Sequence, residues 1–235
     1  MIQYGKTKIA LLIGAVFVAA LLAACSKGKD DMALVEEGEF TVGSDTGEAD
    51  EKPARKVFVK SFYIDKYEVA NGAYKKFVEA QKHRQPKDWE AYGLPEDALK
   101  YPVVFVSYKD AESYCKWAGK RLPTEDEWEK AARGADGRTY PWGSGFDKNN
   151  ANTSLSGVIG TTRVGQYETG KSPYGAYDMA GNVWEWTTSD FNDRTKVVRG
   201  GSWGLTHRFA TTYFRGAYNP DTAVNNLGFR CALDN

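Results

Sequence analysis

The sequence predicts an α+β domain built from two main helices, small sheets and extensive irregular loops. Two stretches carry the capping-box pattern of a helix start, at 107–110 and 124–127. The run 57–67 is rich in β-branched and aromatic residues, which is typical of a strand. Residues 134–175 are dominated by Gly, Asn, Ser and Thr, and this composition predicts loops there.

Upstream of these helices, the pattern predicts a strand, a further helix and a surface excursion. Residues 34–42 alternate loosely between apolar and polar side chains and end at a Gly-Ser pair, as a strand followed by a turn does. Asn71 is expected to cap a helix, because apolar residues recur after it at helical spacing. The stretch 81–100 is polar and contains two prolines, so we expect it to run over the surface.

The segment 102–106 is short and apolar, and it predicts a strand that leads into the first capped helix. Each capped helix is expected to bury one apolar stripe and to stop at a glycine. The stripes are Ala111, Tyr114, Cys115 and Ala118 in the first helix, and Trp128, Ala131 and Ala132 in the second.

The N-terminus has the pattern of an exported bacterial lipoprotein. Two lysines precede an apolar run that is shorter than the roughly 20 residues of a membrane-spanning helix. The run ends in Leu-Ala-Ala-Cys, a lipobox pattern, so we expect residues 1–24 to be removed as a signal peptide and Cys25 to be lipidated. A chance cysteine after an ordinary signal is the alternative. Residues 25–31 would form a lipidated tether, and the serine after Cys25 favours a surface-exposed position on the outer membrane.

The composition describes a globular domain without a strongly charged partner. The chain is 42% hydrophobic and 14% aromatic, which excludes a disordered chain. Removal of the signal and its two lysines leaves 29 basic against 31 acidic side chains. This balance argues against nucleic acid or anionic lipid as the main partner. The 211 residues that remain suit one domain with a single core, which we expect to be a monomer.

Cysteine usage predicts one disulfide. With Cys25 lipidated, Cys115 and Cys231 remain in an oxidising compartment, where a bond between them is the economical interpretation. Two separate buried thiols are the alternative. A bond would tie the C-terminus to the helix after residue 107 and contribute about 3–5 kcal/mol.

Six motifs occur in an order that resembles one known family. They are WAGKRLPTE at 117–125, Trp128-Glu129, YPWG at 140–143, GNVWEW at 181–186, RGGSW at 199–203 and GFR at 228–230. Together they are similar to the formylglycine-generating-enzyme (sulfatase-modifying factor) family, and the resemblance covers residues 32–235. It implies a variant of the C-type lectin fold. It also implies the Cys115–Cys231 disulfide, because the family links the matching positions.

The catalytic chemistry of that family does not carry over. Its enzymes use two cysteines that hold copper, and the matching positions here are Leu205 and Ala210. An aliphatic side chain is neither a copper ligand nor a redox thiol. Related iron enzymes use a histidine cluster in a further domain, whereas this chain has only two histidines. We therefore expect no enzyme activity, no copper and no iron.

The resemblance also implies a structural calcium site. Its ligands would be the side chains of Asp178 and Glu185 and the carbonyl groups of Gly181 and Val183. Such a set of oxygen ligands suits Ca²⁺. The alternative is that Glu185 pairs with an arginine or caps a turn in an aromatic core.

The stretch 204–226 between the RGGSW and GFR motifs resembles the variable region of one subgroup of the family. In the variable proteins of diversity-generating retroelements, this segment is diversified by adenine-directed mutagenesis and displays a ligand-binding patch. Mutated asparagine codons give mixtures that include Asn, Tyr, Thr, Phe, His and Asp, all of which occur here. The resemblance therefore implies a surface lipoprotein that binds a macromolecular ligand, a protein above all.

The candidate ligand-binding residues mix aromatic and aliphatic anchors with small polar groups, as a paratope does. They are Leu205, Thr206, His207, Phe209, Thr211, Thr212, Tyr213, Phe214, Tyr218, Asn219, Thr222, Val224 and Asn225. For the aromatic members, core packing is the alternative. Arg208 and Arg215 either contact the ligand or bind nearby carbonyl groups of the fold through their guanidinium groups. For Arg215 the structural role is favoured.

Two other functions stay open at this point. The chain could be a non-catalytic lipoprotein that docks in a cell-envelope assembly without diversification. It could also be an oxidase of the formylglycine type, although Leu205 and Ala210 speak against that.

Overall fold

The computed structural model describes Lys29 and residues 31–235. The predicted signal peptide at 1–24, the lipidation site Cys25 and most of the tether lie outside the described residues. The chain divides into two units, Met1–Met32 and Ala33–Asn235. The architecture that follows lies in the second unit, apart from Met32, the first residue of a strand. Among the described residues, no helix is both long enough and apolar enough to span a bilayer.

Four α-helices and four short 3-10 helices occur in the described part of the chain. They are α2 (Asn71–Gln81), α3 (Lys87–Tyr92), α4 (Tyr108–Trp117) and α5 (Glu125–Arg133), with η1 (Ala49–Glu51), η2 (Glu96–Lys100), η3 (Glu168–Gly170) and η4 (His207–Ala210). Both predicted capping boxes are present, so α4 and α5 begin where the sequence indicates. Of the predicted stripe residues, Ala118 is exposed because α4 ends at Trp117 and residue 118 is already its C-cap.

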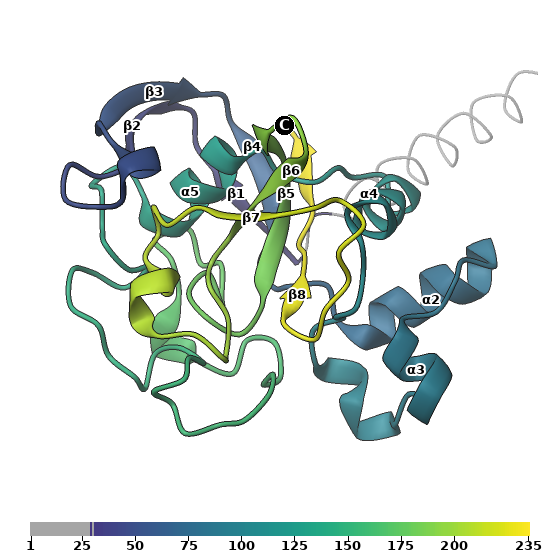
Figure 1. Ribbon diagram of the computed structural model, residues 1–235. Helices are drawn as coiled ribbons and strands as arrows, with labels where there is room; N and C mark the ends of the chain where they lie inside the picture. The colour runs from purple at the N-terminus through teal and green to yellow at the C-terminus, as the bar shows by residue number, and fades with distance from the viewer. Residues whose placement is uncertain (1–28, 30) are drawn as a thin grey trace, which may run out of the picture. The chain divides into compact units, whose positions relative to one another are not determined.

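Three small sheets complete the fold (Figure 1). The three-stranded sheet has the order β1 (Met32–Val35), β4 (Phe62–Asp65) and β9 (Ala232–Asp234). An antiparallel pair consists of β2 (Gly38–Val42) and β3 (Arg55–Val59). The four-stranded sheet has the order β7 (Gly216–Tyr218), β6 (Thr195–Arg199), β5 (Trp184–Asn192) and β8 (Leu227–Gly228). In this last sheet only β8 runs parallel to its neighbour, with Trp184 opposite Leu227.

Several predicted elements differ from the structure. The strands expected at 34–42 and 57–67 are each two strands in different sheets. The strand expected at 102–106 is not formed, because Phe105 has a φ of 57°, which breaks the extended backbone, and only Pro102 forms an isolated bridge.

Helix α2 and the stretch after it also depart from the prediction. The N-cap of α2 is Ala70, and Asn71 instead donates from its side chain to the Ala98 carbonyl at 3.0 Å. The stretch 81–100 is not a simple surface excursion. It contains α3, whose Trp89 is buried and packs edge-on against Tyr74 of α2 with ring centroids 6.0 Å apart.

Two main apolar cores support this frame. One collects side chains of α2, α3 and α4 against β5, with Trp184 and Trp186 at the sheet. The other packs Trp128 and the alanines of α5 against β1 to β4. The four-stranded sheet therefore rests on one core while α5 supports the other, and the loop-rich stretch 134–175 contributes only one short helix, η3.

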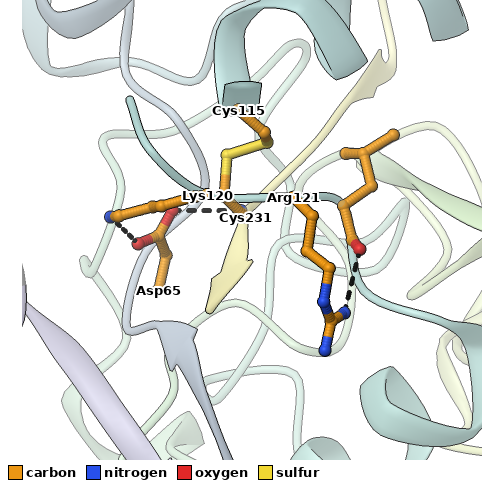
Figure 2. The surroundings of a disulfide bond; sticks show 6 residues. Asp65, Cys115, Lys120, Arg121 and Cys231 are labelled. Carbon is orange, nitrogen blue, oxygen red and sulfur yellow. Dashed lines mark hydrogen bonds and ion pairs between the residues drawn. A yellow bond between two sulfur atoms is a disulfide. The ribbon is translucent and has the colours of Figure 1, made fainter. Parts of the chain in front are cut away.

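The predicted disulfide between Cys115 and Cys231 is present and joins α4 to the residue before β9 (Figure 2). Asp65 lies beside it and accepts hydrogen bonds from the Lys120 ammonium at 2.5 Å and from the Cys231 amide at 3.0 Å. Arg121 exchanges two backbone hydrogen bonds with Ala232. The C-terminus is thus attached to α4 and to the turn after it by covalent and polar contacts.

Candidate ligand-binding face

The segment 204–226, which we call the candidate face, is held at its C-terminal end by Arg230. This guanidinium is fully buried and forms a two-pronged ion pair with Glu185, with Nε to Oε2 and Nη2 to Oε1 both at 2.7 Å. Its remaining N–H groups donate to the carbonyls of Asp65, Lys66 and Tyr177. All five N–H donors of Arg230 therefore bind atoms outside the segment. Arg230 has a structural role, and none of its donors remains for a ligand.

Arg199 holds the N-terminal end of the same segment. It is buried, forms an ion pair with Glu129 and donates to the Phe214 carbonyl at 2.8 Å. Glu129 also accepts hydrogen bonds from Arg133 and from the Gly43 amide, both at 2.8 Å. The bond to Phe214 fixes the middle of the segment to the framework.

Between these arginines, the chain leaves β6, forms η4, returns as β7 beside β6 and enters β8 beside β5 (Figure 1). The turn into it needs Gly201, whose φ is 74° and where a Cβ would lie 2.8 Å from the Phe209 carbonyl. The Trp203 amide donates to the Asn182 carbonyl at 2.9 Å. The backbone of the candidate face is therefore anchored to framework residues at several points.

Four of the candidate ligand-binding residues are exposed. Thr206 and His207 lie at the start of η4, and Asn219 and Asn225 lie in the turn between β7 and β8. The His207 ring also contacts Phe146, with ring centroids 4.8 Å apart, so this fixed aromatic residue adjoins the candidate face.

Seven further candidates are half-buried. Five of them pack against the core cluster that contains Trp184 and Trp186, and two others, Tyr213 and Thr222, are half-buried elsewhere. The five are Leu205, Phe209, Phe214, Tyr218 and Val224. Each of these five side chains packs partly against the core and stays partly exposed to solvent. Core packing and ligand contact, the two roles left open for the aromatic residues, are therefore compatible.

Thr211 and Thr212 do not belong to the solvent-facing set. Both are buried, contrary to the sequence prediction. The Thr212 hydroxyl donates to the Arg138 carbonyl at 2.7 Å, and the Thr211 hydroxyl bonds to the Arg208 carbonyl at 3.3 Å. A buried threonine whose hydroxyl bonds to a backbone carbonyl has a structural role.

The two ambiguous arginines of the segment both form ion pairs with framework acids. Arg215 binds Glu125 with Nε at 2.9 Å and Nη2 at 3.1 Å, which is the structural role favoured from the sequence. Arg208 pairs with Glu48, but both side chains are largely exposed, so this pair is free to exchange with a ligand.

The positions that match the family's copper ligands lie in two different apolar surroundings. Leu205 packs against the core of the four-stranded sheet. Ala210 is buried in a separate small cluster with Ala151 and Ala180. Neither position brings a nitrogen, oxygen or sulfur ligand into the site.

The residues expected to bind calcium surround a buried acidic centre. Glu185 accepts both bonds from Arg230 and a third from the Trp128 indole at 2.7 Å, so its oxygens are occupied. The Asp178 carboxylate accepts from the Gly165 amide at 2.6 Å. In the part of the chain that the structure describes, no cluster of three or more His, Cys, Asp or Glu side chains is arranged to hold a metal. Glu185 thus pairs with an arginine, as the alternative to the calcium site expected. The predicted site also uses two backbone carbonyl groups, and calcium binding there stays a prediction.

Glu68 belongs to the same centre, and the sequence reasoning missed it. It is buried and accepts from the Asn182 side chain at 2.7 Å and from the Val183 amide at 3.3 Å. Burial raises the pKa of Glu68 well above its usual range, and Asp178 and Glu185 raise it further. Burial also raises the pKa of Asp178 to about 6. The only signal in the sequence was an acid directly after the strand predicted at 57–67.

Known proteins share this architecture. A family model described as "Sulfatase-modifying factor enzyme 1-like domain" matches residues 19–235. The chain is 34% identical over 264 residues to "Inactive C-alpha-formylglycine-generating enzyme 2" from Bos taurus, which covers 86% of this chain and 87% of that protein. It is 32% identical over 280 residues to "Formylglycine-generating enzyme" from Mus musculus, covering 86% and 75%.

Solved structures confirm the fold class. PvdO from Pseudomonas aeruginosa superimposes with a TM-score of 0.75 at 24% identity, covering 88% of this chain and 97% of that one. "Treponema denticola variable protein 1" gives a TM-score of 0.72 at 21% identity, covering 87% and 95%. At these identities the likeness concerns the fold. Both an inactive protein and an enzyme stand among the sequence relatives, so function depends on the site.

Proposed function

The chain belongs to the formylglycine-generating-enzyme (sulfatase-modifying factor) family, and we propose that it is a non-catalytic, surface-displayed lipoprotein whose diversified segment 204–226 binds a protein ligand. The observation that carries this proposal is the contrast between backbone and side chains in that segment. Arg199 and Arg230 fix its ends through buried bonds, while its polar residues in η4 and after β7 face solvent. A rigid backbone under changeable side chains is what a recognition surface needs.

Leu205 and Ala210 support the absence of catalysis. The oxidase chemistry of the family depends on copper-binding cysteines, and both positions here are aliphatic. A Cu(I) titration tests this point. Stoichiometric, tight Cu(I) binding by the full chain would contradict it and favour the oxidase alternative.

The DNA around the gene tests diversification. We expect a near-copy of the last hundred or so bases that differs only at adenines, together with a reverse transcriptase gene. Repeated sequencing of the gene from related isolates should find substitutions confined to codons 204–226. Absence of both template and reverse transcriptase would favour the alternative, a cell-envelope assembly lipoprotein with the same fold.

The lipid anchor at Cys25 is a separate part of the proposal. Metabolic labelling with a fatty acid should mark the wild-type chain and not Cys25→Ala. Protease treatment of intact cells should then remove the labelled chain if it faces outward. Labelling that persists in Cys25→Ala would contradict the lipobox interpretation.

A further inference from the structure

The loop between β2 and β3 lies against the candidate face and brings a buried acid to it. Glu51 at the end of η1 is only 5% exposed. Its Oε2 accepts the Glu48 amide at 2.7 Å, whereas its Oε1 has no hydrogen-bond partner. A buried carboxyl oxygen without a partner is costly, and such groups call for a functional explanation.

The other acids around Glu51 already have cationic partners. Glu129 is paired with Arg133 and Arg199. Arg215 binds Glu125 at 2.9 Å and approaches Asp50 at 3.9 Å. Within the described residues, Glu51 is therefore the acid of this group that forms no ion pair.

Two adjoining hollows share Glu51 and Tyr213 as common wall residues. The first, of about 140 Å³, continues between Asp50, Glu125 and Arg215. The second, of about 110 Å³, continues beneath the exposed Arg208–Glu48 pair. Each volume exceeds the about 10–15 Å³ of such space that a water needs, so the end of a ligand side chain has room in this pocket beside Glu51.

We propose that this pocket receives a basic side chain of the protein ligand, a lysine ammonium or an arginine guanidinium, with Glu51 as its counter-ion and the Tyr213 ring as a wall. The inference deepens the proposed function and rests on it. Cations already lie over aromatic rings in this corner, with Arg133 5.5 Å from the Tyr213 centroid and Arg215 5.0 Å from that of Phe191.

One wall residue of the proposed pocket is the same in all variants of the segment, and another can differ between them. Glu51 lies outside segment 204–226, whereas Tyr213 lies within it. Variants of the segment would reshape the pocket but keep the carboxylate. Every variant could thus anchor a basic residue, with the segment deciding what surrounds it.

Glu51 also makes the pocket sensitive to pH. Burial above all, together with the charges of Asp50 and Glu129, raises its pKa to about 7 against the opposing effects of Arg199 and the Arg215 backbone. The other charged or titratable groups that line the two hollows are Glu48, Lys52, Arg55, Glu125, Arg208 and Tyr213. A carboxyl with a pKa near 7 is about ten times more ionised at pH 8 than at pH 6.

The test uses the full chain and two small probes, Nα-acetyl-lysine amide and its neutral analogue Nα-acetyl-norleucine amide. Amide chemical-shift titrations by NMR give the dissociation constants. At pH 8 we expect the lysine probe to bind at least tenfold more tightly than the norleucine probe, with shifts at Gly47 and Tyr213. Between pH 8 and pH 6 its affinity should fall about tenfold.

Glu51→Gln should abolish both the lysine preference and the pH dependence. Glu79→Gln, on the exposed face of α2, is the matched control and should retain both. Equal binding of the two probes, a preference that survives Glu51→Gln, or an affinity that rises in acid would overturn the proposal. If Glu51→Gln does not fold, the comparison of probes and pH on the unchanged chain still decides.

This experiment is independent of the test for diversification. A missing template beside the gene would remove the proposed function and leave the pocket measurement intact. Failure of the lysine probe would remove the pocket and leave the exposed segment as a candidate binding surface.

Discussion

Arg230 holds Glu185 in a two-pronged ion pair in which neither side chain is exposed to solvent. The pair links the GFR motif near the C-terminus to the GNVWEW motif in β5, 45 residues earlier. It therefore fastens the end of the candidate face to β5, one of the two inner strands of the four-stranded sheet.

Breaking this pair from one side should destabilise the fold strongly. Arg230→Met leaves a buried carboxylate without its partner, and we expect the free energy of unfolding to fall by about 3–5 kcal/mol. Chemical denaturation measures the loss. The control is Glu79→Gln, which breaks the exposed pair with Lys75 and should cost less than about 0.5 kcal/mol. A loss below 1 kcal/mol for Arg230→Met would mean that Arg230 does not fasten the face.

Removal of the disulfide should cost a comparable amount. Cys115 and Cys231 are 116 residues apart, and closure of a loop of that length is worth about 4–5 kcal/mol in the chain-entropy model. We expect the double variant Cys115→Ser/Cys231→Ser to lose about that much in denaturant titrations. Added reductant should lower the stability of the wild type toward that of the double variant, and it should leave the double variant unchanged.

Asp110 predicts a dependence of stability on pH. Burial raises its pKa, but hydrogen bonds from Arg84, Ser107 and His83 outweigh this and lower the pKa to about 2. A depressed pKa in the folded state stabilises the fold above the unfolded value of 3.8, and the contribution disappears as the pH falls toward 2.

Asp110→Asn should therefore reduce the free energy of unfolding by about 2 kcal/mol at pH 7 and by little at pH 2. The difference between variant and wild type, measured across this range, isolates Asp110 from other carboxylates. Glu112→Gln, two residues further along α4 and paired with Lys116 on the surface, is the control and should show no such trend. A constant difference at all pH values would rule out the ionic contribution.

The predicted calcium site requires Glu185, whose two carboxylate oxygens both accept hydrogen bonds from Arg230. Because a cation would have to displace Arg230 from both oxygens, we expect the unfolding midpoint to be the same in EDTA and in millimolar CaCl₂. Thermal unfolding followed by circular dichroism measures this. A rise of several degrees that Asp178→Asn abolishes would restore calcium as a structural ligand.

The sequence predicted local features well where a few neighbouring residues decide them. The capping boxes at 107–110 and 124–127 start helices because side chain and backbone satisfy each other within one turn. The disulfide followed from cysteine number, compartment and the family resemblance. The sequence failed at Phe105, where a positive φ and a bond to the Val224 carbonyl replace the expected strand.

The candidate site was less predictable, because its contacts join distant parts of the chain. Nothing near Thr212 indicates that its hydroxyl reaches the Arg138 carbonyl, 74 residues earlier. Glu68 and Glu51 acquire their roles only when the fold buries them among other charges. Composition marked 204–226 as unusual, but only the three-dimensional contacts separate its exposed residues from its structural ones.

This separation gives the last prediction, which concerns the face itself. Thr206→Ala, His207→Ala, Asn219→Ala and Asn225→Ala change exposed side chains, so each should alter the free energy of unfolding by no more than about 0.5 kcal/mol. Thr212→Ala removes a buried hydroxyl that donates to the part-buried Arg138 carbonyl and should cost about 1–3 kcal/mol. Denaturant titrations of the five single variants give the comparison. If the four exposed substitutions cost as much as Thr212→Ala, the segment would be a structural element throughout, and diversification of its exposed positions would be incompatible with a stable scaffold.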